Sequence, residues 1–202
     1  FGWRVSFFSF GIFGVMWAAV WYGWFRDDPR DKPAVTEAEL AEIGPTGAGG
    51  HGGIPWRIAL RSGNLWKIMV MYHFYCWGSF FYLTWLHTYL QKGRGMHEDV
   101  MKYAATLPFI LGAMANLGGG YLGDMLTARY GVKIGRRVIG ASGLFLSGCC
   151  MLLTAMTPDQ MMAVVFLAVG YGCQDAFLPN SWALCLDVGK RYAGSVTGSM
   201  NM

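Results

Sequence analysis

Three glycines near the middle of the chain carry the spacing of a known chemical motif. Gly118, Gly120 and Gly123 fit G-x-G-x-x-G within the stretch GGGYLG. That spacing binds a dinucleotide when it follows a strand and opens a helix. Here it ends a charge-free run, residues 103–123, and no strand–helix–strand pattern surrounds it. The sequence therefore argues against a nucleotide site, and the glycines are expected to let a helix pack closely against a neighbour.

A single carboxylate inside apolar sequence indicates a different kind of chemistry. Asp175 lies near the middle of residues 160–186, which hold no other charged residue. A carboxylate at membrane depth can bind a cation, exchange a proton or pair with a basic group, and a purely structural hydrogen-bonding role is the alternative. Pro179 and Trp182 follow it at i+4 and i+7 on one helix face. Pro179 is expected to kink this helix because it lacks an N–H group.

Polar and aromatic residues also recur along an earlier apolar run. They follow three-four spacing and would share one face of an α-helix: His73, Cys76, Phe80, Thr84 and His87. One interpretation is a cavity-lining face. The other is helix packing together with a histidine at the membrane interface.

Signatures of enzymes and metal centres are missing from the sequence. Neither H-E-x-x-H nor G-x-S-x-G occurs. The five cysteines lie inside apolar runs without a C-x-x-C pair, which favours small packing residues over a disulfide framework or a zinc site. We therefore predict no enzyme, no catalytic residues, no metal and no cofactor.

Long apolar segments must position these side chains. The chain is 54% hydrophobic and 14% charged, whereas a soluble domain carries about 25% charged residues. Five runs with almost no charge each reach the ~20 residues that cross a bilayer core, and in lipid such runs must be helical. We predict an all-α membrane protein with a helix over 1–25 and further helices over about 67–91, 102–123, 138–157, 160–186 and, truncated, 192–202.

Basic residues favour one side of the membrane. Residues 26–67 hold six, 129–137 hold four and 190–191 hold two, which makes twelve of the sixteen in alternate connections. The positive-inside rule places these connections in the cytoplasm and the link around Asp159 outside. The net charge of +4 follows from this bias and does not suggest nucleic acid.

The predicted cytoplasmic loop, residues 26–65, has internal structure of its own. Thr36 precedes Glu39 by three positions, the spacing of a capping box, and predicts a short helix near 37–43. A flexible glycine-rich linker is expected over 44–55.

The order of these segments resembles the major facilitator superfamily and, more narrowly, its anion:cation symporter family. GWRVSFFSFGIFGVMWAAVWYGWFRDDPRDKP is similar to the family's sixth helix and the start of its central loop, and FFYLTWLHTYLQKGRGM to its seventh helix. LPFILGAMANLGGGYLGDMLTARYG resembles the eighth helix with its loop signature, and WALCLDVGKRYAGSVTGSMNM the tenth helix and the start of the eleventh. The resemblance implies a fragment of a twelve-helix transporter that works by alternating access, with 1–25 closing its first half and 66–202 belonging to its second.

The resemblance also implies roles for particular residues. Ser181, Trp182 and Asn201 match positions that line the substrate cavity in sugar-acid members. Cys76 and Phe80 stand where many members have an asparagine and a tyrosine, with Thr84 on the same predicted face. The loop signature between the eighth and ninth helices is matched by Gly120, Asp124, Arg129, Gly131 and Lys133. Asp124 is expected to contact a loop arginine or a helix N-terminus in one conformation and to lose that contact in the other.

We expect a monomeric, multi-pass protein of the bacterial inner membrane. It would import a small organic anion, such as a sugar acid or another carboxylate, by proton symport, with Asp175 as a proton-coupling candidate. Its partners would be this anion, protons and the lipid bilayer, without nucleic acid. The alternatives are an efflux transporter for a drug or metabolite, a transporter-like membrane sensor and a channel.

Overall fold

The computed structural model describes residues 2–26, 28–43 and 56–202. These residues form helices and no strands, which confirms the predicted all-α fold. The chain divides into two compact units, Phe1–Gly53 and Ile54–Met202. The predicted glycine-rich linker, residues 44–55, lies outside the described residues.

The first unit contains α1 (Trp3–Trp24), the short 3-10 helix η1 (Pro29–Asp31) and α2 (Glu37–Ile43). The predicted capping box forms at the start of α2. The Thr36 N–H donates to Glu39 Oε2 at 2.8 Å, and the Glu39 N–H donates to Thr36 Oγ1 at 3.3 Å. The predicted helix over 37–43 is therefore confirmed.

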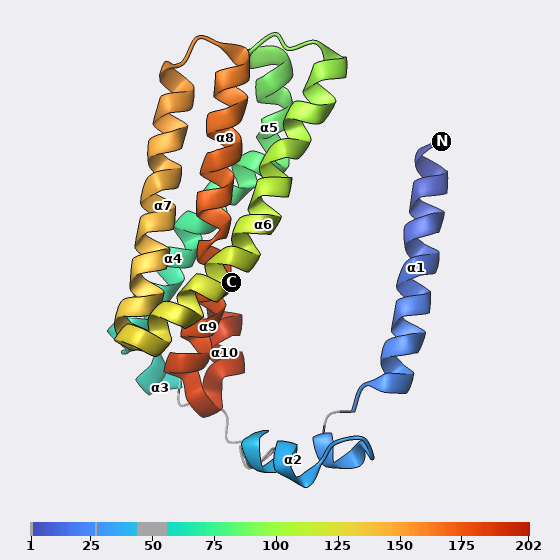
Figure 1. The fold of residues 1–202 in the computed structure, drawn as a ribbon, viewed down its shortest axis with the longest axis vertical. Coiled ribbons are helices and arrows are strands. Elements are labelled where there is room, and N and C mark those ends of the chain that lie inside the picture. The colour runs from blue at the N-terminus through green and yellow to red at the C-terminus, as the bar shows by residue number, and fades with distance from the viewer. Residues whose placement is uncertain (1, 27, 44–55) are drawn as a thin grey trace. The chain divides into compact units, whose positions relative to one another are not determined.

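The second unit begins with a long helical stretch, Gly63–Gly93, after the single turn α3 (Trp56–Ala59). Two wide π-helical turns interrupt this stretch: α4 (Gly63–Phe80) is followed by η2 (Phe81–Trp85), α5 (Leu86–Thr88) and η3 (Tyr89–Gly93). The remaining helices are α6 (Glu98–Tyr130), α7 (Val132–Met156), α8 (Gln160–Asp175), α9 (Phe177–Gly189), η4 (Lys190–Tyr192) and α10 (Ala193–Met200). Within this unit, α8 lies between α6 and α7 (Figure 1).

Four helical segments in the described part of the chain are long and apolar enough to cross a membrane. They are α1, α6, α7 and the nearly continuous pair α8–α9, Gln160–Gly189. The sequence predicts about six such segments. The other two predicted segments correspond to the π-interrupted stretch Gly63–Gly93 and to α10, which has eight residues.

Two helices extend well beyond their charge-free runs. α6 ends at Tyr130, where the sequence predicts an end near 123, and α7 begins at Val132, where it predicts a start near 138. A charge-free run marks the length that suits hydrocarbon, whereas a helix can continue into water with charged side chains on its surface. Gly131 alone separates the two helices, with φ at 84°, a left-handed conformation that glycine adopts without steric cost.

The apolar core of the second unit has two centres. One lies near the connections that we predict to be external and includes Tyr82, Leu90, Met101, Leu167 and Tyr171. The other joins α4 to α9 and α10 through Ile68, Tyr72, Tyr75, Phe177, Cys185 and Met200. Asp175 connects the two centres, because it shares α8 with Tyr171 of the first and is hydrogen-bonded to Tyr75 of the second.

Arg94 fixes the connection after η3 to the turn between α7 and α8. Its guanidinium donates to the carbonyl oxygens of Thr154 and Thr157, the latter at 2.5 Å, and its Nε donates to the Tyr89 hydroxyl at 2.7 Å. The Gln160 side chain returns a hydrogen bond to the Arg94 carbonyl at 2.7 Å. Arg94 therefore satisfies carbonyl groups at the C-terminal end of α7, which the helix itself leaves without donors.

Candidate functional site

Asp175 is held by a tyrosine from a distant helix. The Tyr75 hydroxyl on α4 donates to Asp175 Oδ1 at 3.0 Å. The Asn116 amide on α6 donates to the backbone carbonyl of Asp175 at 3.5 Å. Among the described residues, no basic side chain forms an ion pair with Asp175. Asp175 is half-buried, and its carboxylate accepts a hydrogen bond from Tyr75 without an ion-pair partner among the described residues.

A break in the helix explains why the Asp175 carbonyl can take a donor from α6. α8 ends at Asp175 and α9 begins at Phe177, so the helix is interrupted at Ala176, whose backbone angles stay helical at φ −60° and ψ −23°. Pro179 has no N–H group to donate to the carbonyl four residues earlier, which is that of Asp175. The Asn116 amide supplies a replacement donor.

Gln174, which the sequence analysis does not single out, connects three helices beside Asp175. Its Nε2 donates to the Tyr75 carbonyl at 3.1 Å and to Ser79 Oγ at 2.8 Å, both on α4. Its Oε1 accepts from Ser147 Oγ on α7 at 3.5 Å. With its polar atoms engaged, Gln174 serves to position α4 and α8. An uncharged amide does not interrupt an apolar run. The sequence therefore marks Gln174 only as a polar residue inside such a run.

A groove of about 890 Å³ runs between α4 and the end of α10. It brings together four residues that the sequence singles out: His73, Cys76, Phe80 and Asn201. Trp77 and Tyr72 also line it, and the Trp77 indole donates to His73 Nε2 at 3.0 Å. The wall is mainly apolar, with aromatic and methionine side chains and a few polar groups, a composition common in small-molecule sites.

Thr84 and His87 do not belong to this groove, although the predicted spacing places them on the same face. Both are exposed, but neither lines it. The π-helical turn at Phe81–Trp85 adds residues to the turn and rotates all later side chains relative to Cys76 and Phe80. The three-four spacing assumed a regular α-helix, and that assumption was wrong beyond Phe80.

Ser181 and Trp182 lie on different sides of α9. Successive residues on an α-helix are about 100° apart. Ser181 is 1% exposed, and its hydroxyl donates to the Leu178 carbonyl at 2.7 Å. It lines a second groove, together with Lys67 and Arg136, and does not join Asn201. Trp182 is partly exposed and interacts with the Tyr72 hydroxyl, which borders the α4–α10 groove.

One loop-signature residue, Asp124, contacts an arginine where α6, α7 and α9 meet. Arg136 Nη1 lies 2.8 Å from Asp124 Oδ1 and 3.3 Å from Asn180 Oδ1, and Arg136 Nε lies 3.5 Å from Asp187 Oδ2. The expected arginine partner of Asp124 is thus Arg136. The Arg129 guanidinium instead lies over the Tyr130 ring, 5.5 Å from its centroid. Lys133 lines the second groove beside Arg136.

The glycine motif serves helix packing at this same place. Asn180 is buried, and its amide donates to the Gly119 carbonyl at 2.8 Å. A Cβ atom on Gly119 would lie 2.5 Å from the Ala176 carbonyl oxygen, and one on Gly123 would overlap Asn180 Oδ1. A Cβ atom on Gly120 would make ordinary contact with Pro179, and one on Gly118 would meet open space. The packing residues are therefore Gly119 and Gly123, four apart, and only one of them completes G-x-G-x-x-G.

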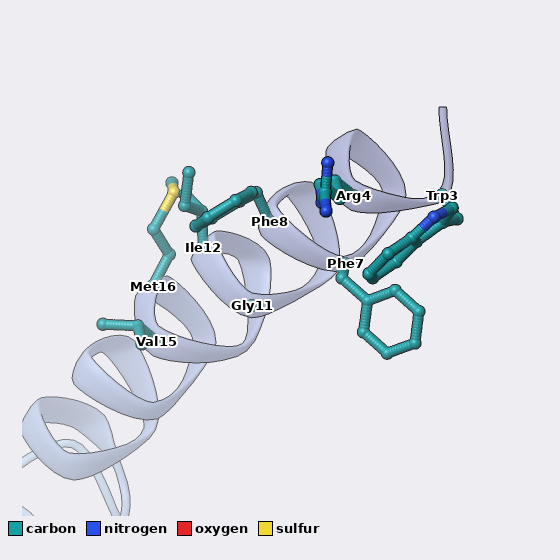
Figure 2. Close-up of a pocket in the computed structure, with 8 residues that line it drawn as sticks. All are labelled: Trp3, Arg4, Phe7, Phe8, Gly11, Ile12, Val15 and Met16. Carbon is teal, nitrogen blue, oxygen red and sulfur yellow. The ribbon is translucent and has the colours of Figure 1, made fainter. Parts of the chain in front are cut away.

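The described residues contain no metal-ligand cluster, and the groove along α1 has no converging polar groups. No group of three or more His, Cys, Asp or Glu side chains among them could hold a metal ion. In the first unit, side chains from Trp3 to Met16 line a shallow groove along α1 (Figure 2). All of them come from one helix, and Arg4 is the one charged side chain among them, so this groove does not converge polar groups on a ligand.

Comparison with known proteins gives a consistent result along the whole chain. The sequence profile described as "Major Facilitator Superfamily" matches residues 1–202. A probable sulfoacetate transporter of Cupriavidus necator is 30% identical, over 99% of this chain and 47% of the relative. The hexuronate transporter of Bacillus subtilis is 28% identical over 100% and 47%, and the chloroplastic ascorbate transporter of Arabidopsis thaliana is 28% identical over 100% and 38%. The chain thus spans about half the length, or less, of these relatives.

Proposed function

This chain belongs to the Major Facilitator Superfamily, and on that premise we propose that it works in a secondary transporter that imports a small organic anion together with protons. It is a multi-pass membrane protein and, like its family, no enzyme. The observation that carries the proposal is the match along the whole chain to relatives named for organic anions, among them sulfoacetate and hexuronate. We place it in a bacterial inner membrane as a monomer, because two of these relatives are bacterial and one copy of the fold is sufficient for alternating access.

Proton symport has a physical reason. Moving one elementary charge across 100 mV involves about 2.3 kcal/mol, so an anion entering a cell that is negative inside works against the membrane potential. A co-transported proton cancels the anion's charge, and the inward proton gradient then drives accumulation. The half-buried Asp175, which has hydrogen bonds but no ion-pair partner among the described residues, supports this coupling.

The α4–α10 groove is the proposed substrate wall of this half. Asn201 offers an amide that can bind a carboxylate, and Trp182 adjoins the same wall through Tyr72. Cys76 and Phe80 give the wall a less polar surface than an asparagine and a tyrosine would. Ser181 is left out of this proposal because its hydroxyl is buried and engaged.

Uptake by the whole protein in proteoliposomes tests the proposal. Labelled glucuronate, galactonate and sulfoacetate are supplied with and without an imposed inward proton gradient. Accumulation should require the gradient, and unchanged uptake after a protonophore would refute the coupling. Trp182→Ala and Asn201→Ala should lower uptake, whereas Leu186→Ala, an exposed position on α9, should not. Unaltered uptake in both test variants would refute the site.

The same preparation separates the other functions. Efflux of a drug or metabolite predicts exchange of such compounds and no exchange of organic anions. A sensor predicts binding of an anion without flux, and a channel predicts flux that neither saturates nor follows the proton gradient.

The inner contact of Asp124 with Arg136 is the proposed latch of alternating access. Asp124→Ala should favour the conformation that lacks this contact. The change is measured as the alkylation rate of Cys76, which lines the α4–α10 groove and is half-buried. Equal rates in wild type and variant would argue against the latch.

A further inference from the structure

We infer that Asp175 binds a proton and that protonation allows α4, α6 and α8 to pack closely around this side chain. We call this helix interface, which is formed around Tyr75, Asn116 and Asp175, the seam. The inference deepens the proposed symport and rests on it. It assigns the proton to the carboxylate of Asp175, and it assigns to Tyr75 the role of positioning that carboxylate.

The geometry fixes this carboxylate from two sides. The Tyr75 hydroxyl donates to Oδ1 at 3.0 Å, while Oδ2 faces α6 at Gly112, where a Cβ atom would lie 3.4 Å away. Because Gly112 has no side chain, the Tyr171 ring packs where a Cβ atom would lie 2.6 Å from it, and Asp175 Oδ2 lies against the same part of α6. The Asn116 amide, one turn further along α6, binds the carbonyl of the same aspartate. A small shift of α6 relative to α8 would therefore change the surroundings of the Asp175 carboxylate.

Among the described residues, no basic side chain pairs with the ionised form. The described titratable groups that face Asp175 are the phenols of Tyr75 on α4 and Tyr171 on α8, and α6 contributes the neutral amide of Asn116. Removing an uncompensated carboxylate from water is expensive, whereas the neutral acid is far easier to bury. The ionised form therefore requires an open, hydrated seam, and the protonated form tolerates a closed one.

The position along the chain connects this proton to conformational change. Asp175 is the last residue of α8, directly before the break at Ala176. α8 belongs to the outer core centre through Leu167 and Tyr171, whereas α9 reaches the inner arginine network through Asn180. A change in charge at the break therefore acts where the outer and inner halves of this helix can bend relative to each other.

Infrared difference spectroscopy on the whole protein in lipid, recorded between high and low pH, tests the assignment without a substrate. We expect a protonated-carboxyl C=O band that Asp175→Asn abolishes. Tyr75→Phe should raise the frequency of this band, because the carbonyl loses a hydrogen-bond donor. Tyr82→Phe is the matched control, since Tyr82 is also buried but donates to the Leu167 carbonyl. An unchanged band in Asp175→Asn, or equal shifts in both tyrosine variants, would overturn the inference.

Transport assays supply a second readout that separates the two proposals. With labelled glucuronate, galactonate or sulfoacetate, Asp175→Asn should lose accumulation driven by the proton gradient and keep exchange between equal internal and external pools. Gradient-driven accumulation at the wild-type level in this variant would refute the role of Asp175. Wild-type uptake that ignores the gradient would instead refute the symport. If Asp175→Asn does not fold, Asp175→Glu decides, since it should keep a carboxyl band at a changed frequency and an unchanged band would refute the assignment.

Discussion

The guanidinium of Arg136 on α7 lies 2.8 Å from the carboxylate of Asp124 on α6, yet the two side chains differ greatly in exposure. The Arg136 side chain is 12% exposed and that of Asp124 is 73% exposed. Arg136 also contacts Asn180 and Asp187 of α9. Arg136 is therefore the shared centre of this network, and Asp124 is its solvent-facing member.

This asymmetry predicts unequal effects on stability. Asp124→Asn should change the free energy of unfolding by less than about 1 kcal/mol, because exposed ion pairs contribute little. Arg136→Ala should cost about 3 kcal/mol, because it leaves the buried Asn180 side-chain oxygen and the partly buried Asp187 carboxylate without their partner. Unfolding in mixed detergent micelles measures both, with the exposed Arg137→Ala as control. Equal losses in the Asp124 and Arg136 variants would contradict this account.

The packing of α6 against α9 predicts opposite effects at two nearby glycines. Gly123→Ala places a methyl group on Asn180 Oδ1 and should cost about 1–3 kcal/mol of unfolding free energy, as overpacking does. Gly118→Ala meets open space and should stabilise α6 by up to about 1 kcal/mol, because alanine is the better helix former. The same unfolding assay compares them. Similar losses in both variants would mean that the close approach at Gly123 is not what limits packing.

The hydrogen bonds of Arg94 predict that a shorter side chain at this position will open the structure locally. In Arg94→Lys a single ammonium cannot reach the Thr154 and Thr157 carbonyls and the Tyr89 hydroxyl together. The loss should be about 2 kcal/mol, in the range for hydrogen bonds to charged groups. Amide hydrogen exchange should become faster in the last turn of α7, up to Met156. Lys92→Ala, on the exposed side of the same connection, should leave the exchange unchanged.

The capping box at the start of α2 predicts a dependence on pH. The Thr36 backbone N–H, and then the Thr36 hydroxyl, donate to the Glu39 carboxylate and hold the pKa of Glu39 below its ordinary value. The stabilisation of α2 is therefore complete above the ordinary pKa and is lost as pH falls through the lowered one.

Backbone chemical shifts of residues 37–41 in the whole chain should show this loss of helix in acid. Glu39→Gln should remove the transition, and Glu37→Gln, in the same first turn, should retain it. A transition that survives in Glu39→Gln would assign it to another group.

The helical segments were predictable because apolar length leaves few alternatives in a membrane. The residues at which the helices begin and end were less predictable. Charge marks where a segment leaves hydrocarbon, but α6 continues to Tyr130 and α7 begins at Val132 because neither helix needs to stop at the bilayer surface. Pro179 correctly indicated an irregular helix, since a missing N–H group is a local property of the residue.

The site was predictable where one charged residue stands out and not where neutral groups act together. Asp175 is visible in the sequence because charge is rare at that depth. Its partner Tyr75 is one of many aromatic residues, and the pairing depends on how α4 crosses α8. Gln174 and Asn180 are amides that hydropathy does not detect, although both organise the helices around them.

The wide turns at Phe81–Trp85 and Tyr89–Gly93 also affect how residues can be compared between relatives. A π-helical turn is the form that an α-helix takes when it accommodates an added residue without unfolding. A relative with regular turns there would need a gap at each point to keep equivalent positions aligned. An ungapped alignment past Phe80 would therefore assign roles to neighbours of the true counterparts, and mutagenesis of this helix should be planned from three-dimensional superposition.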